Sequence, residues 1–158
     1  MIQLRERSAS ATRPPPDEAV LSGHEHQGGS VPTMLRTIGA IAVLVVGAVH
    51  LQQYFSYHLS SVSTIGPLFV LNFAGAMVIG LGLLVPAARL RLVHGLLALG
   101  GIGLAATSFV FLFISEHQSL FGFHEHGYRV AIVIALAAEA VAVVTLAAYL
   151  ATRGRSGA

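Results

Sequence analysis

The amino-acid sequence predicts an all-α polytopic membrane protein, an antiparallel bundle of four transmembrane helices that follows a disordered N-terminal tail. Three observations predict this fold: four long apolar runs, a shortage of charged residues, and arginines placed at the ends of the runs. Hydrophobic residues make up 54% of the chain and charged residues only 10%, whereas a soluble domain carries about 25% charged residues. The composition therefore indicates that lipid surrounds most of the chain.

Residues 1–33 are expected to form a disordered cytoplasmic tail. The segment contains three consecutive prolines from Pro14, a Gly28-Gly29 pair and few large apolar side chains. Such a composition buries too little apolar surface to offset the entropy of ordering the chain. The start lacks the basic region and apolar core of a cleaved signal peptide, so the first apolar run is expected to remain as a membrane helix. A second short cytoplasmic tail is expected at residues 153–158.

Four apolar runs define a transmembrane domain over residues 34–152. Each is close to the ~20 residues that a helix needs to cross a hydrocarbon core of ~30 Å. The runs do not alternate in polarity, which favours helices over the strands of a closed barrel. Short connections require neighbouring helices to run antiparallel. The expected spans cover about residues 37–55, 67–85, 92–114 and 130–150.

Local signals support the second span and the contacts between spans. Pro67 stands in the expected first turn, where a proline costs no backbone hydrogen bond, and Pro86 ends the run. Small residues recur at helical spacing, and such residues let membrane helices approach closely. We therefore expect helix contacts at Ala76, Gly80, Gly100, Gly101, Gly103, Ala131, Ala135, Ala138 and Ala142.

The positions of the arginines predict the orientation in the membrane. Those expected on one side of the bundle are Arg36, Arg89, Arg91, Arg153 and Arg155. Outside the N-terminal tail, only Arg129 is expected on the other side. Because cytoplasmic loops are enriched in basic residues, both termini are expected in the cytoplasm.

Composition also excludes several classes of function. A formal net charge of +2, with dispersed arginines, gives no basic patch for nucleic acid. The chain has no cysteine, which excludes disulfides, iron–sulfur clusters and thiolate catalysis. The glycines within the apolar runs form no phosphate-binding motif. The use of arginine without lysine, with much alanine, glycine and valine, is typical of a GC-rich bacterial genome, so a bacterial plasma membrane is the expected location.

Glu139 is the first candidate functional residue, because it lies near the middle of the fourth apolar run. A carboxylate at that depth is costly, and it indicates either a functional site or a hydrogen bond that joins helices. Its position beside the alanine stripe predicts that it faces the bundle. Polar residues expected at a similar depth are His50, Asn72, Thr107 and Ser108. We expect Glu139 to be mainly protonated and to donate a hydrogen bond to one of them, because low dielectric disfavours an unpaired carboxylate.

The outer end of the first span is the second candidate site. His50 and Tyr54 share one face of the expected helix. Tyr57 or His58 would extend that face, and Gln53 is a polar neighbour. The alternative is a belt of interfacial aromatic residues with polar partners.

The outer loop between the third and fourth spans is the third candidate. Its nitrogen and oxygen ligands suit a divalent metal, and zinc, manganese, iron or Cu(II) fits them better than Cu(I). The spacing matches no diagnostic metal motif, so a solvated polar loop is the alternative. Haem is not expected, because His50 and His94 lie near opposite ends of their spans. The candidate metal ligands are Glu116, His117, His124, Glu125 and His126, with His58 as an additional candidate.

These features leave three kinds of function open, of which the sequence favours the first. The first is a non-enzymatic accessory subunit or structural component of a membrane complex, which fits the small size and short loops. The second is a metal-binding, proton-active or redox-active module that uses the outer His/Glu cluster and Glu139. The third is a small proton-coupled transporter that acts as an oligomer. Beyond the lipid bilayer, the expected partners are a second copy of the chain or a larger membrane complex.

The predicted orientation can be tested with single cysteines, since the native chain has none. We expect an impermeant thiol reagent to label cysteines at Ser61 and Ser119 in intact cells, because both loops are predicted to face outward. A cysteine at Ser156 should react only after the cells are permeabilised. Labelling of Ser156→Cys in intact cells would reverse the orientation.

Overall fold

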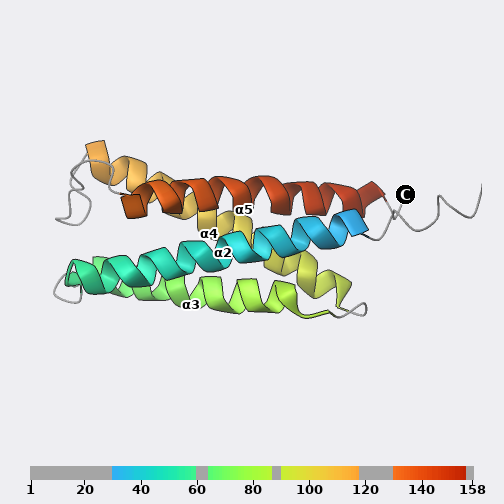
Figure 1. The fold of residues 1–158 in the computed structure, drawn as a ribbon, viewed down its shortest axis with the longest axis horizontal. Helices are drawn as coiled ribbons and strands as arrows, with labels where there is room; N and C mark the ends of the chain where they lie inside the picture. The colour runs from blue at the N-terminus through green and yellow to red at the C-terminus, as the bar shows by residue number, and fades with distance from the viewer. Residues whose placement is uncertain (1–29, 60–63, 87–89, 118–129, 156–158) are drawn as a thin grey trace, which may run out of the picture.

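The computed structural model describes residues 30–59, 64–86, 90–117 and 130–155 of the chain. These residues form the helices α2 (Ser30–Ser56), α3 (Ile65–Leu84), α4 (Arg91–His117) and α5 (Val130–Arg155), with no strand among them. Consecutive helices run antiparallel (Figure 1). All four are long and apolar enough to cross a membrane. The predicted all-α four-helix fold is confirmed, and the chain is a multi-pass membrane protein.

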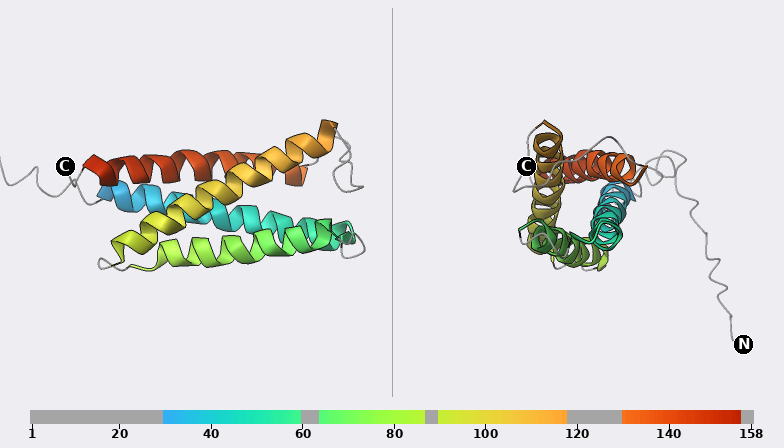
Figure 2. Two further views of the ribbon diagram at one scale, coloured as in Figure 1. Left: turned by 180° about the vertical axis from the view of Figure 1, so that it is seen from behind. Right: turned by 90° about the vertical axis from the view of Figure 1, so that its left-hand side faces the viewer.

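The bundle has two ends, which Figure 2 shows from a second direction. The termini end holds the start of α2, the end of α3, the start of α4 and the end of α5. The distal end is the opposite one. The described arginine side chains, Arg36, Arg91 and Arg153, belong to the helix segments at the termini end. The side of the membrane that this end faces stays a prediction.

Three of the helices extend beyond the apolar runs that predict them. The lengths of α2, α4 and α5 are 27, 27 and 26 residues, whereas α3 has 20. α2 begins at Ser30, so residues 30–33 are helical although the sequence suggests a tail there. An apolar run marks the part of a helix inside hydrocarbon, but the helix itself can continue through polar residues such as Thr33. Pro32 is accommodated because amides in a first turn have no acceptor within the helix.

The boundaries of α3 follow the local signals in the sequence. The helix begins at Ile65, with Pro67 in its first turn, and Thr64 precedes it without a side-chain cap. It ends at Leu84, and Val85 then adopts an extended backbone conformation. An extended residue before Pro86 is expected, because a proline disfavours helical geometry in the residue that precedes it.

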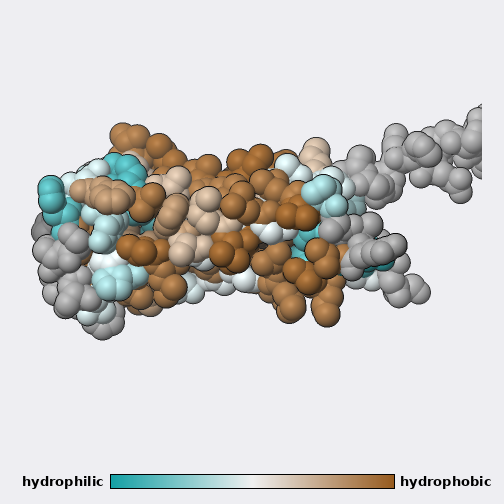
Figure 3. Space-filling model, turned by 90° about the horizontal axis from the view of Figure 1, so that it is seen from below, coloured by the Kyte–Doolittle hydropathy of each residue, from teal (hydrophilic) through white to brown (hydrophobic). Residues whose placement is uncertain are grey.

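Small and aliphatic side chains form the core between the helices. α2 packs mainly against α3 and α5, while α4 packs against α3 and α5 from the other side. α4 crosses the bundle obliquely (Figure 2). Larger apolar side chains point outward, and Figure 3 shows them over the middle of the molecule with hydrophilic residues toward both ends. The most buried core residues are Ala40, Val43, Val46, Ala76, Leu83, Ala98, Ala105, Ala142 and Leu146.

Close contact between α2 and α3 depends on small residues. A Cβ atom added at Gly47 would lie 2.6 Å from Ala76 Cβ, and one at Gly80 would lie 2.5 Å from Leu44 Cγ. Gly80 and Ala76 were among the expected contact positions. Gly101 of α4 makes a similar approach, with Leu146 2.8 Å from its added Cβ. The small residues therefore bring the backbones together, as expected for helices in lipid.

A polar cluster connects three helices at the termini end. His94 is only 3% exposed, and its Nε2–H donates to the backbone carbonyl of Val85 at 3.1 Å in the matching tautomer. Arg36 Nη1 lies 3.4 Å from both ring nitrogens of His94. The cluster thus holds the start of α2 and the end of α3 against α4.

The contact at Gly47 predicts a specific effect on stability. Gly47→Ala places a methyl group against Ala76, so we expect α2 and α3 to separate slightly. The free energy of unfolding should fall by about 1–3 kcal/mol, the usual cost of overpacking a core. Unfolding by SDS in mixed micelles, followed by circular dichroism, measures the change.

The expected helix contact at Gly103 is wrong, because this residue is exposed and an added Cβ meets nothing within 4 Å. Gly103→Ala is therefore the matched control. Adding Ala76→Gly to Gly47→Ala removes the methyl group that the new Cβ would contact, so it should restore most of the lost stability. Equal stability of Gly47→Ala and Gly103→Ala would contradict the close contact.

Candidate functional site

A cavity of about 130 Å³ lies between the four helices in the distal half of the bundle. Every helix contributes to its lining, and most of the lining side chains are apolar. Water needs roughly 10–15 Å³ per molecule, so the space can hold several waters or one small organic molecule. The polar side chains that line it are His50, Gln53, Tyr57, Asn72, Ser108 and Glu139.

Glu139 of α5 is the acidic residue of the cavity. It is 3% exposed, and its Oε2 has no hydrogen-bond partner among the described residues. The expected hydrogen bond from Glu139 to another helix is therefore not formed by that oxygen. The described arginine side chains belong to the termini end, so they cannot neutralise an ionised carboxylate here. The protonated form is the less costly one in these surroundings.

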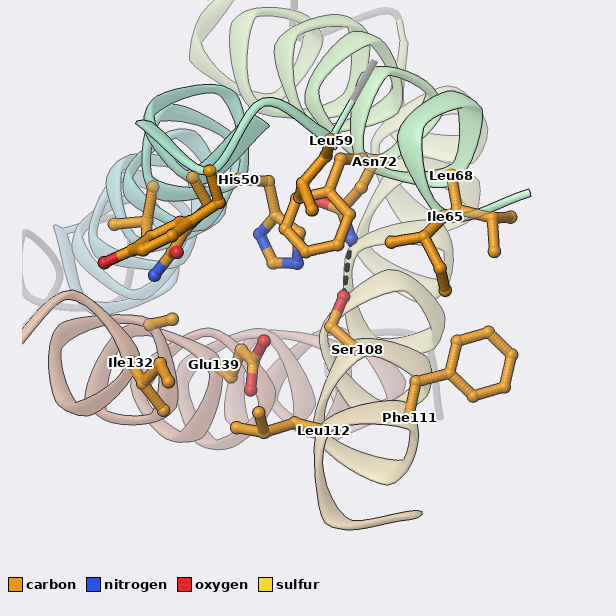
Figure 4. A pocket seen from close by; sticks show the side chains of 15 residues that line it. His50, Leu59, Ile65, Leu68, Asn72, Ser108, Phe111, Leu112, Ile132 and Glu139 are labelled. Atoms are coloured by element: carbon orange, nitrogen blue, oxygen red, sulfur yellow. Dashed lines mark hydrogen bonds between the residues drawn. The ribbon is translucent and has the colours of Figure 1, made fainter. Parts of the chain in front are cut away.

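His50 of α2 points into the same central space as Glu139 (Figure 4). Its Nδ1–H donates to the Val46 carbonyl one helical turn earlier at 2.8 Å. In a neutral imidazole this bond leaves Nε2 with the lone pair, so Nε2 is a proton acceptor. The ring also packs against Phe69 of α3, with 5.1 Å between ring centroids. These contacts fix both the tautomer and the position of His50.

Asn72 and Ser108 connect α3 and α4 beside the cavity. Asn72 Nδ2 donates to Ser108 Oγ at 2.5 Å (Figure 4). The other amide atom, Oδ1, is buried without a partner among the described residues. The sequence places Asn72 and Ser108 at the same depth but does not predict their mutual bond. The bond leaves a second acceptor, Asn72 Oδ1, at the cavity.

The residues that line the cavity therefore supply two free hydrogen-bond acceptors among the described residues and one carboxylic acid. The acceptors are His50 Nε2 and Asn72 Oδ1, and the acid is the Glu139 carboxyl. A protonated carboxyl donates one hydrogen bond, whereas an ionised one only accepts. This arrangement suits water, a transferable proton or a ligand that donates hydrogen bonds. Apolar walls would exclude most other polar molecules.

Thr107 is the predicted site residue that the structure separates from the others. It occupies an exposed position on α4, while the adjacent Ser108 lines the cavity. Counting residues along a helix gives depth in the membrane, but successive residues lie about 100° apart around the axis. Depth in the membrane alone therefore cannot identify which residues of a helix face the cavity. Tyr54 and His58 also lie outside the cavity lining, and His58 is exposed beyond the end of α2.

The proposed metal cluster falls mainly outside the described residues. Glu116 and His117 belong to the last turn of α4, but their side chains are not among those described, and His124, Glu125 and His126 lie in the undescribed range 118–129. Within the described ranges, no group of three or more potential metal-ligating side chains occurs. Metal binding stays a prediction from the sequence.

Gln53 has a larger part in the cavity than its place in the sequence indicates. Gln53 is 7% exposed and lines the cavity one turn from His50. The spacing of positions 50, 53 and 57 indicates that they share one face of a helix, because it follows the helical repeat of three and four residues. The neighbouring tyrosines also fit a belt of interfacial aromatic residues, so the spacing alone does not identify a cavity. Tyr57 completes this row at the distal end of α2.

Comparisons of the chain with protein-family models, with curated proteins and with solved structures find no match. Function is therefore inferred from the chemistry of the cavity.

The bond between Asn72 and Ser108 is expected to stabilise the contact between α3 and α4. Ser108→Ala leaves a buried amide donor without its acceptor. We expect the free energy of unfolding to fall by about 0.6–1.7 kcal/mol, the range typical of hydrogen bonds between membrane helices. SDS unfolding of the purified variant measures the loss.

Thr107→Val is the matched control, since it removes the neighbouring hydroxyl from an exposed position and should change stability by less than about 0.5 kcal/mol. A double-mutant cycle that combines Ser108→Ala with Asn72→Leu then measures the interaction free energy between the two residues. No coupling in that cycle would show that the bond contributes nothing.

Proposed function

We propose that this chain is a small proton-active integral membrane protein, in which Glu139 binds and releases a proton inside the distal cavity. The supporting observation is a buried carboxyl at a cavity shared by all four helices, one oxygen of which has no partner among the described residues. Ionisable groups inside membrane spans are rare, and they commonly mark proton relays or ligand sites.

A purely structural role fits Glu139 less well. A carboxyl that only joins helices would donate to a neighbouring helix, as Asn72 donates to Ser108. Glu139 Oε2 forms no such bond with the described residues. A buried polar group without its partner costs about 1–3 kcal/mol. Its presence at a cavity is better explained by a function that needs a free acid group.

His50 is the expected exchange partner for this proton. The lone pair on Nε2 can accept a proton from the Glu139 carboxyl, either directly or through cavity water. The products are a carboxylate and an imidazolium, which stabilise each other across the low-dielectric space. The reverse transfer restores two neutral groups. Proton exchange between Glu139 and His50 therefore needs no further charged residue.

The wider role is proposed from the size of the four-helix bundle. Four helices enclose only a narrow path, so we expect this protein to act as an accessory subunit of a larger membrane complex or as a homo-oligomer. The predicted location is a bacterial plasma membrane with both termini in the cytoplasm, which puts the cavity in the outer half of the bilayer. A proton-coupled transporter is the alternative, and proton flux in proteoliposomes distinguishes it from local exchange.

Infrared difference spectroscopy during a pH titration tests whether Glu139 exchanges a proton. We expect a C=O stretch of a protonated carboxyl that responds to bulk pH and shifts in D₂O. Glu139→Gln should abolish this band and leave the fold intact, because the amide keeps the shape but cannot titrate. The control is Glu116→Gln combined with Glu125→Gln, which alters the other acidic residues beyond the N-terminal tail. The band should persist in that control, and its survival in Glu139→Gln would contradict the proposal.

Glu139→Leu separates this role from a structural one. Replacing an unsatisfied carboxyl by an apolar group should leave the free energy of unfolding unchanged or raise it by about 1–3 kcal/mol. A large loss of stability in Glu139→Leu would instead favour a carboxyl that holds the helices together.

A further inference from the structure

A groove separate from the cavity runs between α4 and α5 at the termini end. It has a volume of about 490 Å³, and it lies where the oblique α4 diverges from α5 (Figure 2). The groove has two kinds of lining, basic residues at its polar end and leucines along its length. The lining consists of Arg91, Leu92, Gly95, Leu96, Leu99, Leu150, Arg153 and Gly154.

The leucines of α4 make this groove a lipid-facing surface. Leu92, Leu96 and Leu99 are 75%, 60% and 57% exposed. Their spacing of three and four residues puts them on one face of the helix. Together with Leu150 they form an apolar track that leads from the arginines toward the middle of the membrane.

Arg153 is held across the groove rather than extended into water. Its guanidinium lies 5.5 Å from the centre of the Tyr149 ring. The same group occupies the space beside Gly95, where an added Cβ would be 2.9 Å from Nη1. The glycine therefore makes room for the guanidinium at the surface of α4. Arg91, one turn earlier on α4, is exposed at the same end.

Among the residues that the structure describes, no carboxylate lies beside the arginines at this end. Beyond the N-terminal tail the chain contains only Glu116, Glu125 and Glu139 as acidic residues. Glu139 lines the distal cavity, and Glu116 belongs to the distal turn of α4. The folded helices therefore offer Arg91 and Arg153 no carboxylate at the termini end. An anion from outside the bundle could neutralise the charge of these two arginines.

We propose that this groove binds one anionic phospholipid. Arg91 and Arg153 hold the phosphate, and an acyl chain lies along Leu92, Leu96, Leu99 and Leu150. A basic pocket between membrane helices, continued by an apolar track, matches the two parts of such a lipid. Guanidinium groups also bind phosphate oxygens with paired hydrogen bonds. A soluble anion would leave the apolar track uncovered.

Native mass spectrometry of delipidated protein in a non-ionic detergent tests this site. The probes are phosphatidylglycerol and phosphatidylcholine with identical acyl chains. Each arginine beside an anionic headgroup contributes roughly a fivefold gain, so we expect about a 25-fold preference for phosphatidylglycerol. Arg91→Gln combined with Arg153→Gln should remove the preference. Equal binding of the two lipids by the unmodified protein would by itself overturn the proposal.

Two further measurements identify the occupant. Arg5→Gln combined with Arg7→Gln is the charge-matched control, and it should keep the full preference. Glycerol phosphate, which has the headgroup chemistry without acyl chains, should not displace the lipid at millimolar concentration. Displacement would assign the site to a soluble phosphate. Leu96→Cys tests a second copy of the chain, because efficient disulfide dimerisation in phosphatidylglycerol bilayers would show that protein covers the groove.

Discussion

Close contact between helix backbones is the constraint on which this bundle depends. Lipid tails are as apolar as leucine, so no hydrophobic force brings the helices together, and van der Waals packing must do so. Small residues meet this requirement, and the core between α2 and its neighbours consists largely of them. The same constraint determines where the cavity lies. On each helix a small contact residue is followed, one turn toward the distal end, by a polar residue of the cavity. The four pairs are Gly47 and His50, Ala76 and Asn72, Ala105 and Ser108, and Ala142 and Glu139.

This alignment gives the protein a packed half and a functional half. In the packed half, small residues and the Arg36–His94 contact fix the helices relative to one another. In the distal half, polar side chains from all four helices line the cavity together with larger apolar residues. Stable packing in the first half allows the second half to retain a carboxyl oxygen that has no partner among the described residues. Functional sites commonly retain such costs when the surrounding structure holds them in place.

Much of the fold can be predicted from the sequence, because hydropathy reports directly on burial in lipid. Pro67 and the small residues of α3 also identify local features that the structure contains. The site is predictable to the level of depth, and His50, Asn72, Ser108 and Glu139 do surround one cavity. The direction of each side chain is harder to predict. Thr107 shares that depth but occupies an exposed face, and the bond between Asn72 and Ser108 depends on which faces of α3 and α4 meet. The ends of the helices are also hard to predict from hydropathy, because polar residues can continue a helix beyond the hydrocarbon.

The unequal lengths of the helices have a consequence for the surrounding bilayer. At ~1.5 Å per residue, α3 is about 30 Å long, whereas the other helices are about 40 Å long. Only α3 therefore matches a hydrocarbon thickness of ~30 Å without tilt. The longer helices can tilt or extend into the headgroups, but α3 has no spare length. In a thicker membrane the lipids beside α3 must compress, so hydrophobic mismatch is concentrated on one side of the molecule. That side is where a thick bilayer most favours replacement of lipid by another protein.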